Sequence, residues 1–261
     1  MHRKRLIVAA ILLPLLYLYI MRLPAVFFFV LLTAISLTAL SEFYAMYRVT
    51  GILKYLGLFA GLFITGVSFF AREYLLDALI ISVMTILAVR LLSKKNPLSS
   101  LHDLAAPLTG ILYVPCLMQF QSDLRKIGPE WIIFLYATVW AADSMAYYIG
   151  KGIGKRKLYK EVSPNKTVAG GVGSLIGGTA GSLIMMAAIV PSLHAPAAVL
   201  TGIIIGVISI IGDLIESMFK RDAGVKDSSV IIPGHGGILD KIDGSLFSGP
   251  VLYWIITAIS R

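Results

Sequence analysis

Long apolar stretches separated by short polar breaks run through the whole chain. Nine of them have about the length of a membrane-crossing helix, since the hydrocarbon core of a bilayer takes about 20 helical residues. We predict helices near residues 6–21, 24–40, 52–70, 74–92, 101–120, 130–149, 169–190, 195–219 and 246–260. The pattern therefore predicts an all-α fold, a polytopic integral membrane bundle of about nine transmembrane helices.

The composition supports a membrane protein. Mean hydropathy is +0.85, 57% of the residues are hydrophobic and 14% are charged, whereas about 25% of residues are charged in a soluble domain. No hydrophilic stretch is long enough for a second domain. We expect one continuous membrane domain, with N-terminal helices over 1–130 and a catalytic region with polar loops over 131–261. The single cysteine, Cys116, excludes an intramolecular disulfide.

The basic residues predict the orientation. If the N-terminus is cytoplasmic and the chain crosses nine times, 18 of the 23 Lys and Arg residues lie in cytoplasmic segments, which is the positive-inside asymmetry. The polar loops around 151–167 and 220–243 then both face the cytoplasm. The net charge of +9 fits contact with anionic lipids better than a nucleic-acid partner.

The carboxylates are concentrated in one region, with six of the fourteen between Gly212 and Asp243. Asp213, Glu216 and Lys220 are spaced three and four apart, so they share one helix face. A Glu216–Lys220 salt bridge and a functional role for Glu216 are equally good interpretations. Asp213 lies one turn deeper, and a carboxylate inside a membrane helix is a functional hypothesis by default.

A glycine-rich segment, 233–237, surrounds His235. Glycines permit turns in which successive backbone N–H groups face an anion, so the segment is a candidate phosphate cradle. Asp240 and Asp243 follow it and share one face if the chain there is helical. Oxygen ligands from Asp213 and Asp240 suit a hard ion such as Mg²⁺.

A second polar constellation lies upstream. Asp143 stands near the end of the predicted helix 130–149. Ser163 and Pro164 suit the cap and first position of the next helix, and Lys166 beside the free N–H groups forms an anion site. The alternative is an ordinary capped helix with a snorkelling lysine.

Small residues recur on two neighbouring helices. Gly173, Gly177 and Gly181 are four residues apart, and Gly202 and Gly206 repeat that spacing on the following helix. Such faces allow backbones to approach closely. We expect the two helices to pack together beneath the site.

The two polar regions, 140–174 and 212–243, resemble the CDP-diacylglycerol synthases, also called phosphatidate cytidylyltransferases. The C-terminal motif of that family is matched by Ser217, Lys220, Arg221, Lys226, Asp227, residues 233–237, Asp240 and Asp243, with Lys241 where the family usually has Arg. The upstream motif is matched by Trp140, Asp143, Ala146, Tyr147, Gly150, Gly154, Ser163, Pro164, Lys166, Thr167 and Gly170.

The resemblance implies a nucleotidyltransferase of phospholipid biosynthesis. Such an enzyme converts CTP and phosphatidic acid to CDP-diacylglycerol and pyrophosphate, here at the cytoplasmic face of a bacterial inner membrane. The expected cofactor is Mg²⁺, with a second cation left open. A groove open to membrane lipids is expected for substrate entry, and the small-residue faces are compatible with a homodimer.

The resemblance also suggests roles for individual residues. Asp213 and Asp240 are the expected metal ligands, with Asp227 and Asp243 as a third ligand or as groups behind the ligands. Phosphate binding is expected from Lys166, Lys220, Arg221 and Lys226, with His235 orienting a phosphate. Further substrate contacts are expected at Asp143, Ser163, Thr167, Gly234, Gly236, Gly237 and Lys241.

Two other functions remain open from the sequence. One is a related CTP-dependent enzyme acting on another lipid, such as a CDP-archaeol synthase or a polyprenol kinase, because the sequence says little about lipid tails. The other is a transporter, which would carry polar residues near the middle of several helices. The first five helices carry few charges, with Asp77 and Asp103 as the main acidic residues, and this disfavours transport.

Overall fold

The computed structural model describes residues 14–94, 96–231 and 236–259. Within these residues, eight helices are long and apolar enough to cross a membrane, and the one sheet is a two-stranded hairpin. The predicted all-α membrane bundle is therefore confirmed. Of the first predicted helix, residues 14–22 are helical, and the remainder lies outside the described residues.

The helices follow the predicted apolar stretches closely. They are α2 (Ala25–Met46), α3 (Gly51–Phe70), a short 3₁₀ turn (Arg72–Tyr74), α4 (Leu75–Ser93), α5 (Ser100–Tyr113), α6 (Pro115–Ile127), α7 (Pro129–Ile153), α8 (Val168–Ala188), α9 (Ala195–Asp222) and α10 (Leu239–Ile259). Pro115 separates α5 from α6 within one candidate span, because proline has no N–H to continue the ladder. The helix predicted at 246–260 begins earlier, so its polar first turn is helical.

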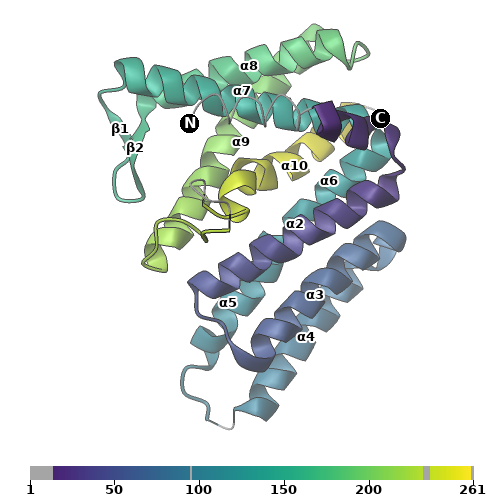
Figure 1. Cartoon of the computed structure of the whole chain (residues 1–261), viewed down its shortest axis with the longest axis vertical. Coiled ribbons are helices and arrows are strands. Elements are labelled where there is room, and N and C mark those ends of the chain that lie inside the picture. Colours follow the sequence, from purple (N-terminus) through teal and green to yellow (C-terminus); the bar gives the residue numbers. More distant parts are fainter. Residues whose placement is uncertain (1–13, 95, 232–235, 260–261) are drawn as a thin grey trace.

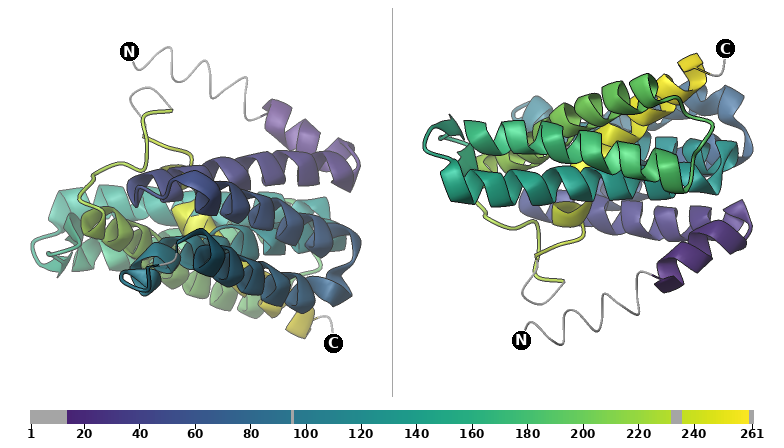
Figure 2. Two further views of the ribbon diagram at one scale, coloured as in Figure 1. Left: turned by 90° about the horizontal axis from the view of Figure 1, so that it is seen from below. Right: turned by 90° about the horizontal axis from the view of Figure 1, so that it is seen from above.

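Helices α7 and α8 lie side by side, next to α9 and α10, while α2 to α6 form the rest of the bundle (Figure 1). The polar loops meet at one end. There the Tyr47 hydroxyl donates to Asp222 at 2.9 Å, and Arg221 Nε donates to the Val162 carbonyl at 3.3 Å. The loop between α9 and α10 lies at the same end as the β1–β2 hairpin (Figure 2).

Small residues let α8 approach two helices closely, whereas the sequence predicted only its packing against α9. The stripe that begins at Gly173 faces α7, where a Cβ on Gly173 would lie 2.7 Å from the Met145 carbonyl oxygen. Helix α8 meets α9 through Gly178, since a Cβ on Gly202 would lie 2.5 Å from the Gly178 carbonyl. The two helices do pack together, and α8 uses a different face for each neighbour.

The start of α8 corrects a prediction. Ser163 and Pro164 do not open a helix, because Ser163–Thr167 forms strand β2, antiparallel to β1 (Lys157–Tyr159). Helix α8 starts at Val168, and the Thr167 hydroxyl caps it by accepting from the Gly170 N–H at 3.1 Å. Serine and threonine both favour N-cap positions. Thr167 rather than Ser163 caps α8 because Ser163 is paired in the hairpin.

Candidate functional site

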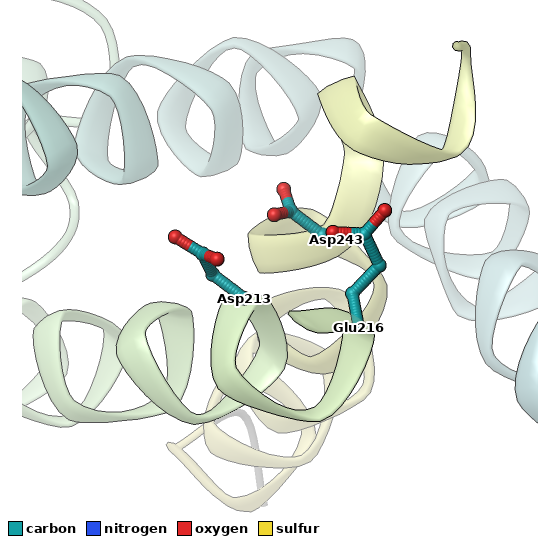
Figure 3. A group of neighbouring side chains, drawn as sticks. All are labelled: Asp213, Glu216 and Asp243. Carbon is teal, nitrogen blue, oxygen red and sulfur yellow. The ribbon is translucent and has the colours of Figure 1, made fainter. Parts of the chain in front are cut away.

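Three carboxylates converge between α9 and α10 (Figure 3). Asp213 and Glu216 come from α9 and Asp243 from α10, and each offers an oxygen within 4.8 Å of the others. The helices can approach this closely because Gly212 has no side chain: a Cβ there would lie 2.6 Å from the Asp243 carbonyl oxygen. Glycine at this crossing therefore sets the distance between the acidic residues.

Two lysines contact this acidic group. Lys166, on the hairpin, places its Nζ 2.6 Å from Asp213 Oδ2. Lys220 Nζ lies 2.5 Å from Glu216 Oε2 and 2.7 Å from Asp240 Oδ1. The Glu216–Lys220 salt bridge considered from the sequence is therefore present. The Glu216 side chain is 1% exposed and that of Asp213 is 40% exposed, so Asp213 is the more accessible acid.

Asp240 is held by donors on both oxygens. Its Oδ2 accepts from the Gly237 N–H at 2.7 Å and the Ser228 N–H at 3.0 Å, and its Oδ1 faces Lys220. Gly236, with φ +86°, makes the left-handed turn that glycine favours. Asp240 as a metal ligand stays a prediction, because the acids grouped with Asp213 are Glu216 and Asp243.

Asp143, on α7, is the fifth acid of the site. Its Oδ1 accepts from the Ser209 hydroxyl of α9 at 2.9 Å. Ser217 similarly donates to Asp213 Oδ1 at 3.3 Å. Hydroxyl donors therefore hold two of the carboxylates in place, and Ser209 is a contact that the sequence did not predict.

A cavity of about 680 Å³ is lined by four of these acids. Its acidic lining is Asp143, Asp213, Asp240 and Asp243, and its basic lining is Lys151, Lys157 and Lys166. Backbone approaches the cavity closely at Gly150, Gly154, Gly170 and Gly171. A lining of four acids and three lysines suits a ligand that combines a cation with phosphate groups.

An apolar groove of about 510 Å³ adjoins the cavity between α8 and α9. Leu158, Gly171 and Ile210 line both spaces. The rest of the groove is lined by Tyr159, Val168, Val172, Leu175, Val207, Ile211 and Leu214. The structure thus has a side groove of the kind predicted for a lipid substrate, leading to the polar cavity.

Other predicted residues lie elsewhere. Arg221 donates to the Val162 and Val225 carbonyls and so ties the hairpin to the end of α9. Lys226, Asp227 and Lys241 are exposed and are outside the described lining of the cavity. Gly234 and His235 lie outside the described residues.

The sequence interpretation missed Glu42, in α2. Its side chain is buried, with 3% of the residue exposed, and its carboxylate accepts from the backbone N–H groups of Ile238 and Leu239 at 2.9 and 2.8 Å. The first helices therefore contribute an acid beyond Asp77 and Asp103. A carboxylate within the apolar run 25–46 was the available signal, by the rule that singled out Asp213.

Comparison with known proteins shows which family the chain belongs to. The sequence matches the Cytidylyltransferase family over residues 3–259. A phosphatidate cytidylyltransferase of Staphylococcus saprophyticus is 36% identical over 211 residues, covering 81% of this chain and 80% of that protein. One from Bacillus subtilis is 30% identical over 268 residues, covering 98% of each chain, and one from Synechocystis is 44% identical over 131 residues, covering 49% of this chain and 43% of that protein. The resemblance seen in the polar motifs is confirmed, and the chain belongs to the cytidylyltransferase family of nucleotidyltransferase enzymes.

Proposed function

We propose that this chain is a phosphatidate cytidylyltransferase, which joins CTP and phosphatidic acid into CDP-diacylglycerol with release of pyrophosphate. One observation carries the proposal: a polar cavity lined by four acids and three lysines adjoins an apolar groove between α8 and α9. A nucleotide fits the first space and acyl chains fit the second. The names of the similar bacterial proteins support the same reaction.

Three acids between α9 and α10 fit a divalent cation. Asp213, Glu216 and Asp243 offer hard oxygen donors within 4.8 Å of one another, a separation that oxygens around one Mg²⁺ with bonds of about 2.1 Å can reach after small side-chain movements. We assign Asp213 and Asp243 as the holding residues, with Asp240 as a further candidate. When bound, Mg²⁺ would neutralise phosphate charge and keep several waters.

The chain's own residues then position the substrates. Lys166 is placed to hold a phosphate of CTP once Asp213 is engaged by the cation, and Lys151 and Lys157 extend the positive wall of the cavity. A phosphatidate oxygen forms the new bond to the α-phosphorus of CTP. The bond to the bridging oxygen breaks, and pyrophosphate leaves with the electron pair. Phosphatidate is already ionised at neutral pH, so no side chain has to remove a proton.

The orientation follows from substrate chemistry and charge. CTP and Mg²⁺ are too polar to enter hydrocarbon, and a diacyl lipid leaves it at high cost, so the reaction belongs at a membrane surface. The site lies at the end of the bundle that holds Arg48, Lys94 and Lys155. By the positive-inside rule we assign this end to the cytoplasm, in the inner membrane of a bacterium.

The test is formation of CDP-lipid by the purified protein in mixed micelles. The reaction contains radiolabelled CTP and phosphatidic acid, with Mg²⁺ or with excess chelator. We expect product with Mg²⁺ and none with chelator. If a folded sample makes no product from phosphatidic acid but does so from another lipid phosphate, the substrate assignment is wrong.

A further inference from the structure

Glu42 contacts the catalytic region from a distant part of the chain. Its Oε1 accepts from the Ser229 hydroxyl at 2.6 Å and from the Ile238 N–H at 2.9 Å. Its Oε2 accepts from the Leu239 N–H at 2.8 Å. A single buried carboxylate on α2 thereby ties together two segments of the loop between α9 and α10.

These contacts fall at the start of α10, the helix that carries Asp240 and Asp243. The first N–H groups of a helix have no partner within the helix, and a negative charge there is favourable. Glu42 supplies both the acceptors and the charge from a neighbouring helix. The position and direction of the first turn of α10 therefore depend on α2.

Glu42 is also linked to Asp240 through one side chain. The Ser228 hydroxyl lies 3.2 Å from Glu42 Oε2 and 2.9 Å from Asp240 Oδ2. A Cβ on Gly237 would lie 2.6 Å from Glu42 Oε2, so the backbone can approach this carboxylate only as glycine. The loop is thus built closely around Glu42.

We propose that Glu42 is a positioning residue for cytidylyl transfer. It fixes the start of α10 so that Asp243 stands opposite Asp213 and the Gly236–Gly237 turn stays against Asp240. The inference rests on the proposed function and deepens it: the N-terminal helices supply a part of the active site's support and do more than anchor the protein in the membrane.

The experiment compares Glu42→Ala, Glu42→Gln and Glu73→Ala with the unchanged protein. Glu73 is an exposed glutamate in the turn before α4 and serves as the matched control.

Manganese binding is titrated by electron paramagnetic resonance, and CDP-lipid formation gives kcat and the KM for each substrate. For Glu42→Ala we expect manganese affinity and kcat/KM to fall roughly 10- to 100-fold, as when groups supporting metal ligands are removed. The KM for phosphatidic acid should stay within about twofold, because α8 and α9 form the groove.

The manganese affinity and kcat/KM of Glu42→Gln should lie between those of Glu42→Ala and the unchanged protein, because the amide oxygen of glutamine keeps one hydrogen-bond acceptor in place. A loss of folded protein alone would lower the number of manganese sites and leave their affinity unchanged, so affinity separates positioning from stability. Unchanged manganese affinity in folded Glu42→Ala overturns the proposal. If Glu42→Ala does not fold, unchanged manganese affinity in Glu42→Gln overturns it.

A separate readout does not depend on the reaction. Lys226 is exposed in the loop that Glu42 holds, so tryptic cleavage there should be faster in Glu42→Ala than in Glu73→Ala. If the unchanged protein makes no CDP-lipid, the proposed function fails, and manganese affinity and cleavage rate still test Glu42. Equal cleavage rates in the two variants would contradict the claim that Glu42 fixes the loop between α9 and α10.

Discussion

Acidic side chains lie inside the helix bundle at both of its ends, with different surroundings. At the end opposite the hairpin, Asp123 of α6 forms an ion pair with Arg72. Arg72 also donates to the Ser68 hydroxyl at 3.2 Å and lies over the Phe120 ring. The Asp123 side chain is 5% exposed and that of Arg72 is 33% exposed, so a buried acid is balanced by a partly exposed base.

The α9–α10 end has an excess of acid. Two lysines, Lys166 and Lys220, form ion pairs with the acids there. The acids are five: Asp143, Asp213, Glu216, Asp240 and Asp243. The accessible acid, Asp213, opens to a cavity. A buried acid alone therefore does not mark a site. An excess of negative charge beside a cavity does, because a bound ligand must supply the cation that balances it.

Removing Lys220 should give the largest effect. Lys220→Met leaves the buried Glu216 carboxylate without its cation, and breaking one partner of a buried ion pair costs about 3–5 kcal/mol. We expect a large drop in the midpoint of thermal unfolding. Adding Glu216→Gln should restore part of the lost thermal stability. No recovery in the double variant would show that the unpaired Glu216 carboxylate does not cause the loss.

Asp243→Asn tests the excess charge directly. The change keeps the shape of the side chain but removes one charged oxygen donor, so we expect CDP-lipid formation to fall by about 100-fold or more. Thermal stability should hold or rise, because like charges at the site are relieved. Near-normal activity at saturating Mg²⁺ would remove Asp243 from the proposed ligands.

Lys166 should show a smaller effect on nucleotide use. Lys166→Met removes the positive charge beside Asp213, and we expect the KM for CTP to rise roughly tenfold. Lys166→Arg keeps the charge and should recover most of the affinity. Steady-state kinetics with CTP as the varied substrate decides, and a rise confined to the KM for phosphatidic acid would contradict the assignment.

Asp123→Asn should have the smallest effect on the reaction. It removes a balanced ion pair at the other end of the bundle, so we expect kcat/KM for both substrates within about twofold of the unchanged protein. Arg72 is a third exposed and keeps other partners, so the stability loss should be about 1 kcal/mol. A large loss of activity would show that the two ends are coupled.

The sequence predicted the helices and the acidic face of α9, because apolar length and helical spacing are local properties. It did not predict which acids meet. Asp243 and Asp213 are brought together by the glycine crossing of α9 and α10 at Gly212, a contact between helices that spacing within either helix does not specify.

Two other features depend on pairings that the local sequence does not specify, one within a hairpin and one between distant segments. Ser163 has the local chemistry of a helix cap, and only its pairing with β1 excludes that role. Glu42 contacts residues 186 to 197 positions away, so no motif around it signals its role. Long-range contacts of this kind require the folded structure.

The most direct test of the acidic site is equilibrium binding of Mn²⁺ to the purified protein without substrates. Electron paramagnetic resonance would follow the titration for the unchanged protein, Asp243→Asn and the matched Asp123→Asn. We expect one saturable class of site in the unchanged protein and in Asp123→Asn, with its affinity lost or strongly weakened in Asp243→Asn. Equal affinity in all three proteins would contradict the claim that the acids between α9 and α10 hold the cation.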